Sequence, residues 1–199
     1  MIKHNLKIFS TIILGFAFLI YGVIFYFTQD FSCININKAI SHATLTISIN
    51  AFIWFLFVKW IWKWKIFYPW LVQFPDLNGK WNGSIQSNWE NKKSDPINIT
   101  VEIEQSFLYL NVCLITEESK SQSIASVFNI DFERGIQQLL YTYNNIPKVG
   151  VRETSAIHHG SVLLNFKDFN AIELDGEYWT SRNTCGEIKL KKDMSSDKG

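Results

Sequence analysis

Cysteine is scarce in this 199-residue chain, and its placement excludes the chemistries that depend on it. The three cysteines, Cys33, Cys113 and Cys185, are an odd number, and no two of them stand at a short spacing. A Cys-x-x-Cys zinc or redox motif is therefore absent, and a disulfide framework is not expected. We predict that Cys113 and Cys185 are ordinary reduced residues of a cytosolic domain.

Catalytic motifs are lacking as well. The sequence has no nucleophile elbow, no Walker loop, no His-Glu-x-x-His and no set of zinc ligands. His158 and His159 are adjacent, so on a strand they point to opposite faces and cannot share a metal ion. The sequence therefore predicts a protein that is not an enzyme and that uses neither a metal nor a cofactor.

Acidic residues are nearly missing from the first part of the chain. Residues 1–74 hold six Lys or Arg and one Asp or Glu, a net charge of +5; residues 75–199 hold thirteen and seventeen, a net charge of −4. The basic part suits an anionic membrane surface. The acidic part is a poor candidate for polymeric nucleic acid, whose binding requires many neutralised phosphates, whereas a small anion needs only one or two arginines.

Two apolar stretches predict membrane spans. The first, residues 6–27, is uncharged after Lys7; about 22 residues at about 1.5 Å each cross a hydrocarbon core of about 30 Å. Lys3 and Lys7 place its N-terminus in the cytoplasm by the positive-inside rule, and a cleaved signal peptide is the alternative. The second span, residues 43–62, contains Asn50, whose amide marks a self-association face, a wet path or the outer interface.

A lysine and tryptophan collar follows the second span. It consists of Lys59, Trp60, Trp62, Lys63, Trp64 and Lys65. Indole rings and lysine stems favour the headgroup level at the cytoplasmic edge of a bilayer, and a tryptophan-rich soluble core helix is the alternative. We therefore predict a transmembrane region over residues 1–74 of a multi-pass protein of the bacterial inner membrane, with both termini cytoplasmic.

The rest of the chain is predicted to be all-β. The expected strands are residues 80–89, 97–105, 107–116, 122–131, 136–143, 157–166, 171–182 and 185–191. Eight short antiparallel strands favour an up-and-down, lipocalin-like β-barrel, with Trp81 and Gly83 closing one end, and a two-sheet sandwich is the alternative. The barrel domain is placed at residues 75–192, before a flexible tail at 193–199.

The strand at 171–182 gives the most specific indication of a site. Its alternation puts Tyr178, Thr180 and Arg182 at the polar end of an inward face that begins apolar. A guanidinium at the mouth of a barrel needs an anionic partner, either a ligand or an acid such as Glu153.

Further candidate ligand-binding residues lie on the preceding strand and in the connection after it. Tyr141 and Tyr143 share one face and are a possible stacking platform for a flat ligand, although tyrosine is also common in barrel cores. Arg152, in the connection over residues 144–156, is a candidate phosphate contact, and a solvated arginine is the alternative.

The layout resembles one known family. Two N-terminal spans precede the segments LNGKWNG at 77–83 and LDGEYWTSRNTCGEIKL at 174–190. This combination is similar to the two-transmembrane, β-strand-rich effectors of bacterial CBASS (cyclic-oligonucleotide-based antiphage signalling) systems, and the resemblance covers nearly the whole chain. It implies a barrel receptor for a cyclic dinucleotide made by a partner nucleotidyltransferase. Ligand binding would then promote self-association of the spans and disrupt the inner membrane lipid, killing the infected cell.

Two other functions remain open from the sequence. A lipocalin-like binder of an apolar molecule would have a mainly apolar interior, with Arg182 outside it or ion-paired. A protein-binding scaffold would have a barrel filled with side chains. The volume of the interior and the direction of Arg182 distinguish these from a dinucleotide receptor.

Overall fold

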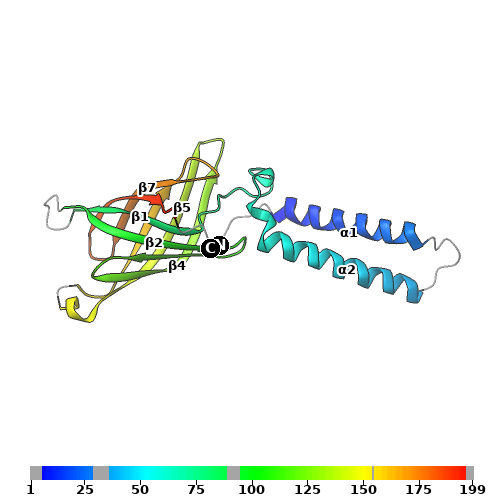
Figure 1. Cartoon of the computed structure of the whole chain (residues 1–199), viewed down its shortest axis with the longest axis horizontal. Helices are drawn as coiled ribbons and strands as arrows, with labels where there is room; N and C mark the ends of the chain where they lie inside the picture. Colours follow the sequence, from blue (N-terminus) through cyan, green and yellow to red (C-terminus); the bar gives the residue numbers. More distant parts are fainter. Residues whose placement is uncertain (1–5, 29–35, 89–94, 154, 196–199) are drawn as a thin grey trace. The chain divides into compact units, whose positions relative to one another are not determined.

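The first part of the fold is a pair of long helices, α1 (Leu6–Thr28) and α2 (Ile36–Lys59), shown in Figure 1. The structure is a computed structural model that describes residues 6–28, 36–88, 95–153 and 155–195. Both helices are long and apolar enough to cross a membrane. Cys33, Lys3 and residues 196–199 of the predicted tail lie outside the described residues. The chain forms two compact units, one ending at Val72 and the other beginning at Gln73.

Helix α2 begins seven residues before the predicted start of the second span at residue 43. Polar residues near the start of the predicted span satisfy their hydroxyls within the helix. Thr44 Oγ1 donates to Ile40 O at 2.9 Å, and Ser48 Oγ donates to Thr44 O at 2.9 Å. Because these side chains bond to carbonyls four residues earlier, they are compatible with a continuous helix.

The two helices pack against each other through Asn50 and aromatic side chains. Asn50 Nδ2 donates to the backbone oxygen of Ile13 on α1 at 3.4 Å, and Asn50 is buried. The ring centroids of Phe9 and Trp54 lie 4.9 Å apart. The Asn50 amide therefore contributes to the contact between α1 and α2 of one chain.

The collar residues are divided between exposed and buried positions. Trp60 and Trp64 are exposed, and Lys59 Nζ lies 4.6 Å from the centre of the Trp60 ring. Trp62 is fully buried, whereas the sequence predicted an indole at the headgroup level. The reason is local: the 3-10 turn η1 (Ile61–Lys63) has three residues per turn, so residues two apart do not share a face. A second such turn, η2 (Lys65–Phe67), follows.

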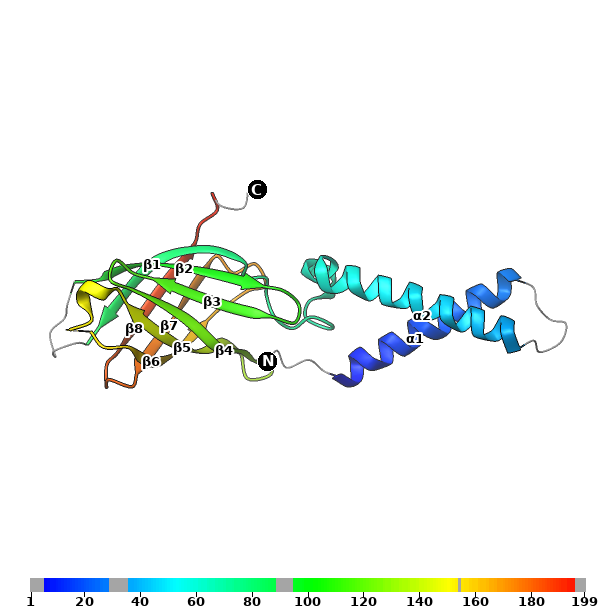
Figure 2. The same cartoon turned by 90° about the horizontal axis from the view of Figure 1, so that it is seen from below.

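The second unit is a closed antiparallel barrel of eight strands, which confirms the predicted fold and excludes the sandwich. Its strands are β1 (Gly79–Ser87), β2 (Ile97–Gln105), β3 (Leu110–Ile115), β4 (Ser119–Asp131), β5 (Ile136–Pro147), β6 (His158–Asn165), β7 (Glu173–Thr180) and β8 (Cys185–Lys192). Each strand pairs with the next, and β8 returns to β1 with Leu190 opposite Gly83. Strand β4 pairs with β3 only through Lys120, Ser121 and Gln122, so the rest of this long strand is paired with β5 alone (Figure 2).

Strand β5 continues four residues beyond its predicted end at residue 143. Residues 144 and 145 look like a turn in the sequence, but they pair with Gln122 and Ser121 of β4. The inward alternation that starts at Leu139 and Tyr141 continues through Asn145, which is buried. The predicted connection over residues 144–156 is correspondingly shorter.

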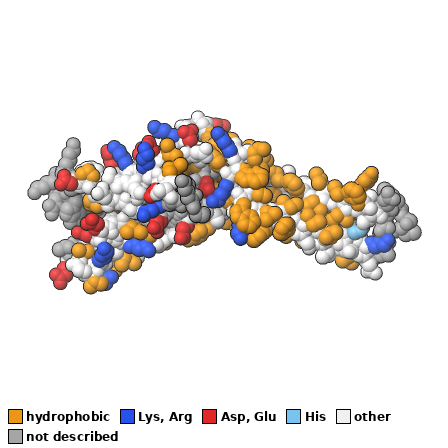
Figure 3. All heavy atoms as spheres, in the orientation of Figure 1, with side chains coloured by type: hydrophobic (Ala, Val, Ile, Leu, Met, Phe, Trp, Pro, Cys, Tyr) orange, Lys and Arg blue, Asp and Glu red, His pale blue; other side chains and the backbone are white. Residues whose placement is uncertain are grey.

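Aromatic and aliphatic side chains fill one end of the barrel. The fully buried members include Phe74, Leu77, Trp81, Phe107, Leu139, Leu164 and Leu174. Phe74, from the segment that leads into β1, stacks on Phe128 with ring centroids 5.3 Å apart. Trp81 Nε1 donates to Leu77 O at 3.0 Å, so this indole helps to close the end at which the chain joins the barrel. On the face drawn in Figure 3, charged side chains lie on the barrel, while apolar side chains cover much of the helices.

Candidate ligand-binding cavity

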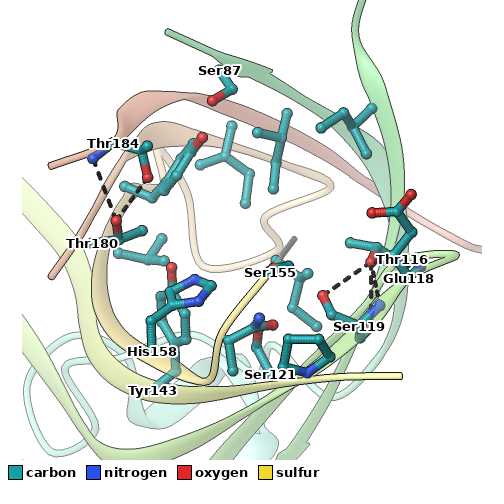
Figure 4. A pocket seen from close by; sticks show the side chains of 18 of the residues that line it. Ser87, Thr116, Glu118, Ser119, Ser121, Tyr143, Ser155, His158, Thr180 and Thr184 are labelled. Carbon is teal, nitrogen blue, oxygen red and sulfur yellow. Dashed lines mark hydrogen bonds between the residues drawn. The ribbon is translucent and has the colours of Figure 1, made fainter. Parts of the chain in front are cut away.

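The other half of the barrel interior is hollow. A cavity of about 800 Å³ lies among the last residues of β1, β3, β5 and β7 and the first residues of β2, β4, β6 and β8. Its size falls within the about 300–1,000 Å³ that small-molecule sites occupy. Figure 4 looks into it. The alternative of a barrel filled with side chains does not hold for this half.

The cavity has two chemically different walls. Strands β8, β1, β2 and β3 contribute mainly aliphatic side chains, namely Ile188, Ile85, Ile97 and Leu114, together with the polar Ser87 and Asn98. Strands β4 to β7 contribute hydroxyl, amide, imidazole and phenol groups, namely Ser121, Asn145, Tyr143, His158, Tyr178 and Thr180. A flat ligand with an apolar face and a polar edge matches this division better than a purely apolar molecule does.

Strand β7 brings the predicted polar face to the mouth. Leu174 and Tyr178 are buried in the interior, and Thr180 and Arg182 line the cavity at the mouth. Thr180 Oγ1 is 2.7 Å from Thr184 Oγ1 across the β7–β8 turn. Arg182 Nη1 donates to Ser155 Oγ at 3.1 Å, and both residues line the cavity. The guanidinium is thus held at the mouth.

Three tyrosines form part of the polar wall. The rings of Tyr141 and Tyr143 have centroids 6.3 Å apart and are tilted by 51°. Burial and, to a smaller extent, the neighbouring Tyr178 raise the pKa of Tyr143 to about 12. Burial also raises the pKa of Tyr178, against the opposing effect of its hydrogen bond with Ser87. All three phenols therefore remain neutral at physiological pH, because burial also raises the pKa of Tyr141.

Two of these rings lie against glycines on neighbouring strands. Tyr143 is opposite Gly160 on β6, and Tyr178 is opposite Gly186 on β8. A Cβ at Gly160 would lie 2.4 Å from Tyr143 Oη, and one at Gly186 would lie 2.8 Å from Tyr178 Cε1. Because glycine has no side chain, each ring can lie flat along the wall, where it leaves the lumen open.

Charge is distributed unevenly around the mouth. Glu117 and Glu118 line it in the turn between β3 and β4, whereas Arg182 lines it after β7. In Figure 4, Glu118 lies on one side of the opening, and Thr180 and Thr184 lie on the other. An anionic group is attracted to the arginine and repelled by the carboxylates, so the mouth orients a ligand whose charge is not central.

Five of the six predicted ligand-binding residues come together in the cavity. Tyr141, Tyr143, Tyr178, Thr180 and Arg182 all line it. Arg152 is not among the lining residues; it follows the short turn η4 (Val149–Val151), is exposed, and donates from Nε to Pro147 O at 3.1 Å. Because β5 runs on to Pro147, the chain is already outside the barrel when it reaches Arg152.

Sequence reasoning missed several polar residues of the cavity. They are Ser87, Ser121, Asn145, Ser155, His158 and Thr184. Asn145 was accessible from the sequence, because one more step of the alternation through Tyr141 and Tyr143 reaches it. Ser155 lies in a connection without periodicity, and no pattern indicates that it meets Arg182.

The described residues include potential metal ligands and two cysteines. Among them, no three His, Cys, Asp or Glu side chains are placed to hold a metal ion. Cys113 is buried, and burial raises the pKa of its thiol, which lowers its reactivity. Cys185 is exposed at the start of β8, where its Sγ accepts a hydrogen bond from Asn88 Nδ2 at 3.1 Å.

The fold and the cavity define a class of protein: a hollow β-barrel receptor for a small ligand, preceded by two helices able to cross a membrane. A family model described as "Cap15, cyclic dinucleotide receptor domain" matches residues 72–192. The chain therefore belongs to the Cap15 family of CBASS effectors, which confirms the resemblance found in the sequence.

Two relatives share the same name, CD-NTase-associated protein 15. The protein from Staphylococcus schleiferi is 33% identical over 147 residues, which cover 74% of this chain and 76% of that protein. The protein from Escherichia albertii is 26% identical over 194 residues, which cover 93% of this chain and 96% of that protein. The second match includes the helical part, so the similarity extends beyond the barrel.

Proposed function

We propose that the cavity binds a cyclic dinucleotide and that binding promotes self-association of α1 and α2, which disrupts the bacterial inner membrane. The observation that supports this most directly is the half-hollow barrel, with neutral tyrosines in its wall and Arg182 at its mouth. A partner nucleotidyltransferase would supply the ligand during phage infection. The protein acts by binding and assembly and has no catalytic step of its own.

The ligand chemistry matches the lining group by group. A cyclic dinucleotide has two flat bases, and stacking of a base on an aromatic side chain contributes about 1–3 kcal/mol. Tyr143 and Tyr178 offer such rings. Its phosphates are suited to the Arg182 guanidinium and to the hydroxyls of Thr180 and Thr184, since charge-assisted hydrogen bonds are the stronger ones.

The membrane arrangement follows from the distribution of lysines. Lys59 is the last residue of α2, and Lys63 and Lys65 follow it, whereas Lys38 is the one lysine near the start of α2. The positive-inside rule then puts the end of α2 and the barrel in the cytoplasm, and an even number of spans puts the N-terminus there too. In this orientation the barrel meets a ligand made in the cytoplasm.

The ligand test uses the full chain in lipid nanodiscs and isothermal titration with a panel of cyclic dinucleotides. We expect wild-type protein to bind at least one of them, and Arg182→Ala to weaken that binding at least about tenfold, since a hydrogen bond to a charged group contributes about 1.5–3 kcal/mol. Arg134→Ala is the matched control, because Arg134 is exposed in the β4–β5 turn, where it pairs with Asp131. If no member of the panel binds wild-type protein, the proposal is wrong.

The membrane test uses the same chain in vesicles that contain a self-quenched dye. We expect the binding nucleotide to release the dye in proportion to cavity occupancy, and Arg182→Ala to require a correspondingly higher concentration. Binding without release would separate the receptor function, which would stand, from the proposed disruption, which would not.

A further inference from the structure

One amide inside the cavity is held by a single hydrogen bond and leaves its donor group free. Asn145 is buried at 5% exposure near the end of β5, and Ser121 on β4 donates from Oγ to Asn145 Oδ1 at 2.8 Å. Within the described part of the chain, Asn145 Nδ2 makes no hydrogen bond. This nitrogen is partly accessible rather than completely enclosed. Both residues line the cavity.

The hydrogen bond from Ser121 orients the amide. In the structure the Asn145 carbonyl is turned towards the Ser121 hydroxyl on β4, and the NH₂ group of the amide makes no bond to Ser121. The amide oxygen keeps a second lone pair. Because Nδ2 is accessible from the cavity, it can donate to an acceptor that the ligand supplies.

The surroundings of this amide suit a base rather than a phosphate. Tyr143 lies two residues earlier on the same inward face and offers a ring beside the amide. Glu117 and Glu118 directly precede β4, the strand of Ser121, and their charge repels an anion on this side of the mouth. Phosphates are therefore directed towards Arg182 after β7, which leaves the β4–β5 wall for a base.

We propose that Asn145, oriented by Ser121, is the specificity-determining residue of the cavity. Its Nδ2 donates to an acceptor on the edge of one base, and its Oδ1 accepts from the N–H next to that acceptor, as in the bidentate pairs of Asn with bases. The class of ligand is thus a cyclic dinucleotide with one base presenting a neighbouring acceptor and donor edge-on to β5. This inference rests on the proposed function and adds which residue distinguishes one base from another.

The experiment measures discrimination rather than affinity alone. Full-length protein in nanodiscs is titrated with cyclic dinucleotides that differ in one base, and the ratio between the tightest and weakest dissociation constants is compared across variants. We expect Asn145→Ala to reduce this ratio by roughly ten- to a hundredfold, the effect of one bidentate pair. Ser121→Ala leaves the amide in place but no longer oriented, so it should reduce the ratio by roughly three- to tenfold.

Asn129→Ala is the matched control. It removes an amide from the outside of the barrel, where Asn129 Nδ2 donates to Gln138 Oε1 at 3.0 Å. We expect it to leave every dissociation constant within about twofold, since exposed substitutions of this kind have small effects. Thermal unfolding of each variant shows whether the barrel is intact.

Four outcomes are distinguished: the first three test the role of Asn145, and the last tests the proposed function. A reduced ratio in both Asn145→Ala and Ser121→Ala supports the assignment. An equal loss for all nucleotides in Asn145→Ala, with the ratio unchanged, overturns it, because Asn145 would then contact a part common to all ligands. If Asn145→Ala does not fold, an unchanged ratio in Ser121→Ala overturns it instead. Absence of binding by wild-type protein would refute the proposed function itself.

Discussion

Replacement of Gly160 by alanine tests whether the tyrosines must lie flat for the cavity to stay open. Gly160 points inward from β6 opposite Tyr143. Its added Cβ would lie 2.4 Å from Tyr143 Oη and 2.5 Å from Tyr143 Cζ, whereas ordinary contacts begin at 3.4 Å. The end of the ring must therefore move by about 1 Å, the difference between these distances. Because the barrel wall lies behind the Tyr143 ring, the ring moves into the lumen.

The expected effect is larger on binding than on stability. Overpacking lowers the free energy of unfolding by about 1–3 kcal/mol. Replacing a strand glycine by alanine raises it by about 0.5–1 kcal/mol. The carbonyl oxygen of Trp179, 2.8 Å from the new Cβ, adds a small backbone shift. We expect a net loss in the free energy of unfolding on the order of 1 kcal/mol. Loss of a stacked base would weaken binding by about 1–3 kcal/mol, roughly ten- to a hundredfold.

The assay is nucleotide titration of the full chain together with thermal unfolding. Gly150→Ala is the matched control, because a Cβ at Gly150 would meet nothing within 4 Å. A Tyr143→Ala background isolates the mechanism: once the ring is gone, Gly160→Ala should weaken binding no further. Binding by Gly160→Ala within about twofold of wild type would refute the reasoning, and so would an undiminished loss in the Tyr143→Ala background.

Two further predictions concern the barrel itself, residues 73–199. Burial holds the pKa of Tyr143 at about 12, above its usual value of about 10, so the folded state retains a proton that the unfolded chain loses between these values. The free energy of unfolding should therefore fall by on the order of 2 kcal/mol as pH rises from about 10 to about 12. Urea unfolding across this range should show a shallower fall for Tyr143→Phe, and equal slopes would contradict the assignment. Gln105 Oε1 accepts from Leu77 N at 2.7 Å, and its Nε2 donates to Pro75 O at 2.9 Å. Gln105→Ala should thus cost about 2–4 kcal/mol by leaving two buried backbone groups unpaired, whereas Gln138→Ala on the outer face should cost about 0.5 kcal/mol or less.

The parts of the fold that alternation predicted are those in which one face is fully apolar. Strand β2 was predicted at 97–105 and runs from Ile97 to Gln105, because Ile99, Val101 and Ile103 are all buried. Strand β5 was predicted four residues too short, because Asn145 is polar and yet faces inward. Around a cavity, inward residues are selected to contact a ligand, so the rule that inside means apolar fails there first.

The residues of the site were predictable within a single strand, but the arrangement of strands around the cavity was not. The change from Leu174 to Tyr178 and Thr180 along one face of β7 shows that an interior becomes polar, and the structure places these residues accordingly. The facing aliphatic wall depends on which strands lie opposite β4 to β7, and that depends on closure between β1 and β8. No local pattern in the sequence encodes such a long-range pairing.

The free energy that one bound ligand contributes limits how far it can drive assembly of the protein. Changing an equilibrium from 1:99 to 99:1 requires about 5.5 kcal/mol of differential affinity. A contact with Arg182 contributes about 1.5–3 kcal/mol, and part of it is offset by the bond to Ser155 that the guanidinium already makes. Several contacts must therefore be stronger in the assembled state than in the single chain. We expect those contacts at the mouth, where Val149 and Ile157 expose apolar surface in the connection that also holds Ser155.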